Sequence, residues 1–339
     1  MTATKKNEDR VRGLLGKFRG KRVAVVGDVM LDRYYWGSVH RVSPEAPVPV
    51  VEVDTESVRF GGAANVANNI QALGGSPFVV GLVGDDHPGS LFTKMMNDQG
   101  LDTSGIVTDS SRPTTIKTRV IAAGQHVVRI DNESKQDSPA HLQARLIDAV
   151  RSNIDSLDGI IIEDYNKGAV TRELIHAVIA LAGERKKPVT VDPKFNNFFE
   201  YRGVTVFKPN RREVEEAVGG KLRTLADMDR AGKHLLDTLR AENVLLTRGE
   251  EGMSLYSADG GVRHLPTTAE VVQDVSGAGD TVIATLTMGL VSGGTIAESC
   301  ILANCAGGVV VGAVGIVPVL PDQLLESALR WMDGREEPF

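Results

Sequence analysis

The part of the chain best suited to chemistry is residues 274–280, which read Asp-Val-Ser-Gly-Ala-Gly-Asp and precede an apolar run. The run predicts a helix, and glycines at a helix start leave backbone N–H groups unshielded at the positive end of the helix dipole. The amides of Gly277, Ala278 and Gly279 could therefore hold a phosphoryl group. Asp280 would lie beside that group as a general base. A capped helix with a flexible entry is the structural alternative.

Short β-branched segments alternate with helical patterns along most of the chain. The segments are residues 22–27, 78–84, 159–163, 189–192, 204–208 and 243–247, and the helical patterns are residues 63–73, 88–99, 141–152, 171–182 and 225–239. This alternation predicts an α/β fold with a mainly parallel sheet covered by helices on both faces. Several strands end in polar residues. Because ligands bind at the carboxyl ends of such strands, we expect these side chains to converge on one edge.

Four further segments read as short strands with no helices between them. They are residues 32–37, 48–53, 115–122 and 126–131. We expect them to form a small antiparallel β lid from about residues 32–53 and 115–131. A sheet of this size needs a partner surface, either the substrate cleft or a second subunit. The apolar side chains of Tyr34, Tyr35 and Trp36 favour the pairing of two lids in a homodimer.

The composition excludes several classes of protein. The chain has 339 residues, of which 42% are hydrophobic and 24% charged, as is typical of a globular protein. No linker or repeat divides it, so we expect a single domain, 1–339. The 38 Lys and Arg against 44 Asp and Glu give a formal charge of −6. No general positive field is therefore available to hold nucleic acid or an anionic membrane.

Two features of the sequence concern the location of the protein. The first ten residues are polar and charged and lack the apolar core of a secretory signal, which predicts a cytoplasmic protein. Residues 299–321 carry no charge and are long enough to span a membrane, but they include Asn304 and Pro318 together with several glycines. A buried helix followed by a turn is favoured there. Cys300 and Cys305 have a spacing that suits neither a metal site nor a redox pair.

Two motifs identify a family resemblance. Residues 61–67, Gly-Gly-Ala-Ala-Asn-Val-Ala, and residues 274–280 resemble the two signatures of the ribokinase-like (PfkB) carbohydrate kinases. The resemblance covers nearly the whole chain and implies a ribokinase-like three-layer fold with a lid, and ATP and Mg²⁺ as cofactors. It also implies that Asp280 takes the proton from the attacking sugar hydroxyl while residues 277–279 hold the phosphoryl group. The helix dipole and a nearby Mg²⁺ should favour the ionised form of Asp280.

Three further segments resemble the members of this family that act on D-glycero-β-D-manno-heptose 7-phosphate. They are residues 41–50, 164–168 and 192–194. The resemblance implies phosphorylation of the anomeric C1 hydroxyl to give the 1,7-bisphosphate, a step toward ADP-heptose for the lipopolysaccharide core. Many bacterial relatives also carry a nucleotidyltransferase, whereas we expect only the kinase activity from this chain.

The resemblance assigns two residues to the metal. Asn210 and Glu213 match an N-x-x-E element that organises Mg²⁺ near the ATP phosphates, largely through water. The same spacing fits a helix capping box, with Asn210 as the N-cap and Glu213 three residues later. A monovalent cation beside the loop at Asp274 is a further option that the resemblance leaves open.

The nucleotide itself is assigned four residues. Thr247 and Gly249 belong to a loop that could turn N–H groups toward the phosphates, although by itself it reads as a common hairpin loop. Ser276 stands where the family more often has Thr, and it retains the hydroxyl group. Asn304 lies where the family builds its adenine pocket, and a buried Asn bonded to the backbone is the alternative.

Residues for the acceptor sugar lie after the first predicted strand and in the first signature. Asp28 and Asp32 could bond sugar hydroxyls or merely open a turn. Gly61 and Gly62 let the backbone approach a ligand, and Asn65 can reach the same cleft, although glycines also end strands. A sugar phosphate also needs cations, which are often only solvated surface charges. The candidates are Arg41, Lys117, Arg119, Arg129 and Lys194.

Two alternative functions remain open at this point. Another sugar kinase, for example one acting on fructose 6-phosphate, would share the nucleotide and base motifs and differ in a few lid residues. A catalytically silent sugar-phosphate sensor is the second alternative. Binding alone would not need a base in the anion hole, so the presence of Asp280 argues against the sensor.

Overall fold

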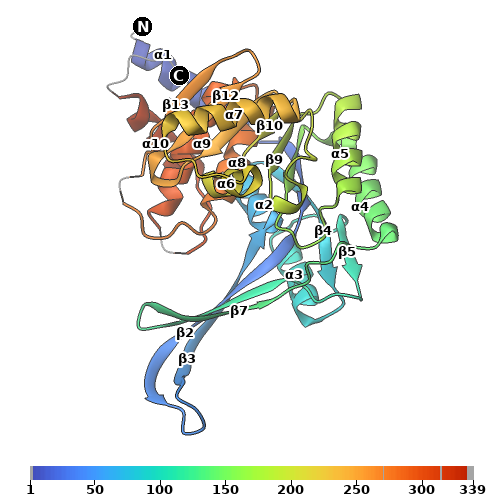
Figure 1. Ribbon diagram of the computed structural model, residues 1–339, viewed down its shortest axis with the longest axis vertical. Coiled ribbons are helices and arrows are strands. Elements are labelled where there is room, and N and C mark those ends of the chain that lie inside the picture. Colours follow the sequence, from blue (N-terminus) through green and yellow to red (C-terminus); the bar gives the residue numbers. More distant parts are fainter. Residues whose placement is uncertain (1–2, 270, 314, 334–339) are drawn as a thin grey trace.

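One large sheet runs through the body of the protein (Figure 1). The computed structural model describes residues 3–269, 271–313 and 315–333, and within these the sheet has nine strands in the order β13-β12-β11-β10-β9-β8-β1-β4-β5. Neighbours from β11 to β5 pair in parallel, and β12 and β13 add an antiparallel edge. The mainly parallel sheet is therefore confirmed. Its strands are β1 Arg22–Gly27, β4 Ser76–Gly84, β5 Ile106–Asp109, β8 Gly159–Glu163, β9 Val189–Asp192, β10 Val206–Phe207, β11 Asn243–Thr247, β12 Met253–Ser257 and β13 Val262–Leu265.

Helices cover both faces of this sheet (Figure 1). One layer consists of α1 Ala3–Gly16, α2 Ala63–Ala72, α3 His87–Asp98, α8 Ala278–Val291, α9 Ile296–Val311 and α10 Pro321–Met332. The other consists of α4 Ala140–Asn153, α5 Arg172–Glu184, α6 Arg211–Val218 and α7 Leu225–Leu239. Alternate residues of β1 serve the two layers, because Val23 and Val25 pack with the first and Ala24 and Val26 with the second. A central strand must therefore be apolar on both faces.

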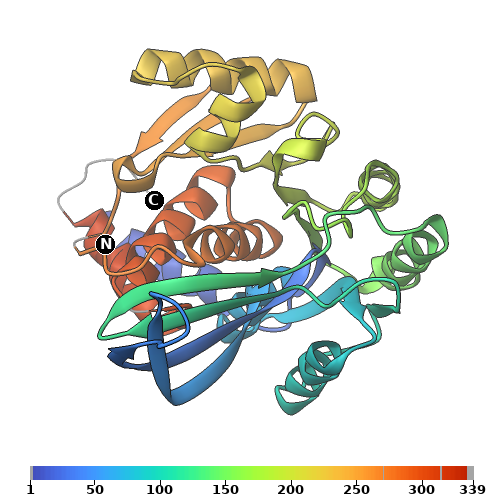
Figure 2. The ribbon, with the colours of Figure 1, turned by 60° about the horizontal axis from the view of Figure 1, so that its bottom comes forward.

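A second, smaller sheet projects from the body as the lid (Figures 1 and 2). Its strands are β2 Val29–Val42, β3 Pro49–Gly62, β6 Ile116–Ala122 and β7 Gln125–Asn132, in the order β3-β2-β6-β7. Two antiparallel hairpins are joined by parallel pairing of β2 with β6. The expected small sheet is confirmed, with longer strands than the pattern predicted. Register shifts after Trp36 and after Val39 interrupt the alternation that the prediction relied on.

The two faces of the lid differ in character. Lys117 of β6 lies with its Nζ 5.6 Å from the centre of the Tyr165 ring, so its face is turned toward the body. Side chains alternate along a strand, and Val120 therefore points to the opposite face. Tyr35 and Val128 are its partners in register on the neighbouring strands. The outward face of the lid is therefore apolar at these positions.

The uncharged stretch 299–321 supplies most of α9, which packs between α8 and α10. Cys300 and Cys305 are both buried in this helix. The expectation of a buried helix there is confirmed. Among the described residues, no helix is both long and apolar enough to cross a lipid bilayer.

Gly27 at the end of β1 generates a prediction, because it lies in register with Glu163 and a Cβ there would collide with the carbonyl oxygen of Glu163. Gly27→Ala should push apart the two central strands and lower the free energy of unfolding by about 1–3 kcal/mol, as overpacked cores do. Thermal denaturation measures this change.

The matched control is Gly183→Ala in α5, where an added Cβ meets nothing within 4 Å. It should stabilise the protein by about 0.5–1 kcal/mol through helix propensity. A Gly27→Ala variant as stable as this control would contradict the close approach of β1 and β8.

Candidate active site

Asp280 lies in the first turn of α8 and is held from two sides. Asn65 donates from Nδ2 to Asp280 Oδ2 at 2.6 Å, and Tyr165 donates from its hydroxyl to Asp280 Oδ1 at 2.9 Å. The carboxylate is almost fully buried. Asn65 comes from α2, so the two signature motifs meet at this one side chain. Asn65 was expected at the acceptor sugar, and the structure places its Nδ2 on the carboxylate of Asp280.

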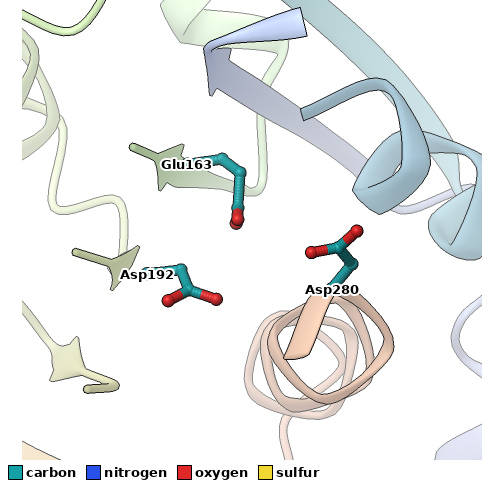
Figure 3. A group of neighbouring side chains, drawn as sticks. All are labelled: Glu163, Asp192 and Asp280. Carbon is teal, nitrogen blue, oxygen red and sulfur yellow. The ribbon is translucent and has the colours of Figure 1, made fainter. Parts of the chain in front are cut away.

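Three carboxylates crowd together at this point (Figure 3). Glu163 at the end of β8, Asp192 at the end of β9 and Asp280 each offer an oxygen within 4.8 Å of the others. Burial raises the pKa of Glu163 well above its ordinary value, and the charges of Asp192 and Asp280 add to the effect. Burial likewise raises the pKa of Asp280 to about 6, against the hydrogen bonds that lower it. Burial thus opposes the ionised form of Asp280 that the helix dipole was expected to favour, although a carboxyl group with a pKa of about 6 is still mainly ionised at neutral pH.

The cluster can accommodate a divalent cation. Both carboxylate oxygens of Glu163 are buried and lack a hydrogen-bond partner among the described residues. Carboxylate oxygens are the hard ligands that Mg²⁺ prefers. Asp280 is engaged by Asn65 and Tyr165, and one oxygen of Asp192 is engaged by Lys208. Glu163, with the remaining oxygen of Asp192, would therefore hold the ion.

Asn210 and Glu213 instead form a capping box at the start of α6. The N–H of Asn210 donates to Glu213 Oε2 at 2.8 Å, and the N–H of Glu213 donates to Asn210 Oδ1 at 2.9 Å. Glu213 Oε1 accepts a hydrogen bond from Lys194. The capping box, which was the structural alternative to Mg²⁺ binding for this pair, is therefore present. Both oxygens of Glu213 are occupied, so any part in Mg²⁺ binding would run through water.

The turn before α8 has the geometry of an anion hole. Gly277 has a φ of +77°, a left-handed conformation that favours glycine. The N–H groups of Gly277 and Gly279 have no acceptor among the described residues, whereas that of Ala278 bonds to the carbonyl of Val275 at 3.3 Å. Two of the three expected donors are therefore free.

Asp274 holds the entry to this turn. Its two carboxylate oxygens accept the N–H groups of Ser276 at 2.9 Å and of Gly315 at 3.0 Å. These bonds fix the loop that carries Ser276.

A cavity of about 450 Å³ opens beside the turn. Its lining includes six residues expected near the nucleotide or the phosphoryl group, and these are Asn210, Thr247, Gly249, Ala278, Gly279 and Asn304. Asn304 also donates from Nδ2 to the carbonyl of Pro266 at 2.7 Å, so the alternative of a buried Asn bonded to the backbone is realised at the same time. The mixture of apolar wall and backbone suits an adenine nucleotide.

Asp28 anchors a loop rather than facing an open cleft. Its carboxylate accepts three backbone N–H groups, from Tyr165 at 2.8 Å, Lys167 at 3.0 Å and Ala169 at 3.0 Å. The side chain is buried. The loop after β8 is thereby fixed to the end of β1.

The other acceptor candidates on β2 and β3 pack against one another. Asp32 is buried and forms an ion pair with Arg119 of the lid. A Cβ at Gly61 would collide with the Asp32 carboxylate, and one at Gly62 would collide with the Asp28 carbonyl oxygen. These glycines are therefore needed for close approach of the two strands, whatever else they contact.

The candidate cations fall into two groups. Lys194 and Lys117 flank Tyr165, with Nζ atoms 5.1 and 5.6 Å from the centre of its ring. Arg129 pairs with Asp131 on exposed β7, and Arg41 is exposed near the end of the long β2–β3 hairpin. The structure thus brings Lys194 and Lys117 to the site and leaves Arg129 and Arg41 outside it.

Four residues of the site were not assigned from the sequence. They are Glu163, Tyr165, Asp192 and Lys208. Lys208 is buried after β10, and its Nζ lies 2.7 Å from Asp192 Oδ2. Although burial acts against its charge, the carboxylates of Asp192 and Glu213 raise the pKa of Lys208, so it stays protonated. The signal that could have found these residues was the convergence of strand ends on one edge.

The site has the parts that phosphoryl transfer to a hydroxyl requires, and comparison with known proteins agrees. Residues 21–323 match the pfkB family of carbohydrate kinases. The chain belongs to this family. It is therefore a phosphotransferase that acts on an alcohol group.

Two relatives of this pfkB kinase are named Bifunctional protein HldE. The one from Geobacter metallireducens is 46% identical over 317 residues, which are 94% of this chain and 65% of the relative. The one from Helicobacter pylori is 43% identical over 295 residues, 87% of this chain and 64% of the relative. The chain thus spans less than two thirds of the length of these bifunctional relatives.

Solved structures share the fold. Ribokinase from Arabidopsis thaliana, complexed with ribose and ATP, aligns with a TM-score of 0.72 and 19% identity over 91% of this chain and 99% of that one. Phosphofructokinase-2 from Escherichia coli aligns with a TM-score of 0.74 and 17% identity over 92% and 99%. The ribokinase-like fold expected from the sequence is confirmed.

The pKa of Asp280 leads to a prediction for the pH dependence of this pfkB kinase. A base must be ionised to accept a proton, and burial raises the pKa of Asp280 to about 6. We expect kcat/KM to be level above that pH and to fall about tenfold per pH unit below it, because the protonated form accumulates there. An acid limb centred near the ordinary pKa of Asp would contradict the environment described for Asp280.

Proposed function

We propose that this kinase transfers the γ-phosphoryl group of ATP to the anomeric C1 hydroxyl of D-glycero-β-D-manno-heptose 7-phosphate. The observation that carries the proposal is the identity of 46% with Bifunctional protein HldE over 94% of the chain. The segments 41–50, 164–168 and 192–194, which resemble heptose phosphate kinases, support it. The product would be the 1,7-bisphosphate on the route to ADP-heptose, formed in the cytoplasm where ATP is available.

The cations around Tyr165 support an acceptor that already carries a phosphate. Lys117 reaches this position from the lid and Lys194 from the body. Burial lowers the pKa of Lys117, and the neighbouring charge of Lys167 lowers it further. A phosphate dianion placed among these ammonium groups would relieve their repulsion. The acceptor would then lie between the lid and Asp280.

The proposed mechanism gives each group of the site a separate task. Asp280 accepts the proton of the C1 hydroxyl as the oxygen attacks the phosphorus atom. The N–H groups of Gly277 and Gly279 stabilise the charge on the transferring phosphoryl oxygens. ATP occupies the cavity lined by Thr247 and Asn304. Mg²⁺, where bound, neutralises phosphate charge.

The acceptor is tested with Mg-ATP and a panel of sugar phosphates that includes heptose 7-phosphate and fructose 6-phosphate. We expect heptose 7-phosphate to have at least about a tenfold higher kcat/KM, since a misplaced phosphate loses its cation contacts. Phosphorus NMR should show a new phosphate on the anomeric carbon. ADP release without acceptor gives the background.

Preference for fructose 6-phosphate would overturn the heptose assignment but would leave the assignment as a sugar kinase unchanged. Binding of sugar phosphates without any transfer would favour a sensor. The matched control is Asp280→Asn, which keeps the size and hydrogen bonding of the side chain and should lower kcat by about 10² to 10⁴ fold.

We also propose that the kinase is a homodimer that pairs through its lid. Exposed apolar side chains gather on the lid strands, among them Val39, Val53, Val128 and Ile130. Val128 and Ile130 share the outward face of β7. An exposed apolar face on a thin sheet is stabilised when a second copy covers it.

Sedimentation measures the dimer. The wild-type protein should sediment as a dimer at micromolar concentration, and Val128→Asp should sediment as a monomer because a charge would be buried in the interface. The matched control is Val218→Asp at the end of α6, an exposed valine away from the lid, which should stay dimeric. A monomeric wild type, or a dimeric Val128→Asp variant, would refute pairing through the lid.

A further inference from the structure

Tyr165 touches the catalytic carboxylate directly, and no role has yet been given to it. Its hydroxyl donates to Asp280 Oδ1 at 2.9 Å. A phenol with an ordinary pKa of about 10 keeps its proton at neutral pH, so the hydroxyl is the donor of this hydrogen bond. Asn65 holds the other oxygen, and together the two donors fix both ends of the carboxylate.

Asp280 needs such restraint because of its neighbours. The carboxylates of Glu163 and Asp192 lie within 4.8 Å and repel an ionised Asp280. A side chain in this position would turn away from the other two if nothing held it. A neutral donor restrains the carboxylate and leaves its negative charge in place, whereas an ammonium group would neutralise that charge.

The loop that carries Tyr165 is rigidly held. The N–H of Tyr165 and two further N–H groups of the loop donate to Asp28 at the end of β1. Asp164, the preceding residue, accepts the hydroxyl of buried Tyr201 at 2.6 Å and the N–H of Asn166 at 2.8 Å. The position of the phenol is thus tied to the ends of the sheet strands by hydrogen bonds on both sides of Tyr165.

We propose that Tyr165 is the positioning residue of the base, and that Asp28 acts through it. The Tyr165 hydroxyl holds Asp280 at the N-terminus of α8 in the orientation that an incoming acceptor hydroxyl meets. Asp28 therefore contributes to turnover by fixing the 165–169 loop, without touching the sugar. The inference rests on the proposed role of Asp280 as the base.

The test is Tyr165→Phe, which removes the hydroxyl and keeps the ring between Lys117 and Lys194. We expect kcat to fall about 10- to 100-fold, because a misplaced base costs rates of this size. The KM values for ATP and for the acceptor should stay within about threefold, because uniform binding is not affected. Tyr256→Phe is the matched control, since it removes another buried hydroxyl bonded to an aspartate, Asp229, away from the site. Its kcat should be unchanged.

Three kinetic results would overturn the proposal. A raised acceptor KM with unchanged kcat would make Tyr165 a substrate contact. A higher kcat/KM would mean that the phenol blocks Asp280. An unchanged kcat would mean that the hydrogen bond does not matter for turnover.

A second measurement does not depend on activity. Melting temperatures are compared for Tyr165→Phe, Asp280→Ala and the double variant. If the two side chains hold each other, the double variant should lose less than the sum of the single shifts. Additive shifts would overturn the proposal. Coupled shifts combined with an active Asp280→Asn enzyme would instead sink the proposed base and leave the contact in place.

Discussion

The structure depends on the confinement of negative charge at the carboxyl end of its sheet. Glu163, Asp192 and Asp280 are buried within 4.8 Å of one another, an arrangement that repels itself. The sheet tolerates this repulsion because the ammonium group of Lys208 pairs with Asp192, and the positive charge of Lys194 also acts on the cluster. Neutral hydrogen-bond donors and the positive end of the α8 dipole provide further stabilisation of the carboxylates. Buried titratable groups of this kind concentrate at functional sites, and here the most costly part of the fold coincides with the site.

Close backbone approach is what brings these groups together. Gly27 allows β1 to lie against β8 at Glu163, Gly61 allows β3 to lie against Asp32 of β2, and Gly62 allows it to approach the carbonyl of Asp28. The left-handed Gly277 turns the chain so that α8 begins with free N–H groups aimed at the same place. Glycines that a sequence comparison would assign to ligand binding are thus required first by the packing, and any contact with a ligand uses the space they create.

Much of this architecture was predictable, and the exceptions have physical causes. Alternating strands and helices predicted the sheet, and the glycine turn predicted the start of α8. The raised pKa of Asp280 was not expected because desolvation depends on burial, which no local pattern reports. Tyr165 was given no role because the segment 164–168 carried only a resemblance, and no sequence pattern reports that the Tyr165 hydroxyl reaches Asp280. The spacing of Asn210 and Glu213 fits both an Mg²⁺-binding element and a helix capping box. Only the three-dimensional structure shows that the capping box forms.

The two faces of the lid differ in their surroundings, and the alternation of side chains along a β-strand gives each face its own set of residues. Lys117 points to the body, where it flanks Tyr165, and Arg119 on the same face pairs with Asp32 of the neighbouring lid strand β2. On the opposite face, Val120 lies in register with the apolar side chains of Tyr35 and Val128. A movement of the lid that brought cations to an acceptor would therefore also move the outward face. If that face is covered by a second copy, the two lids constrain each other, and closing of one site cannot be mechanically independent of the other.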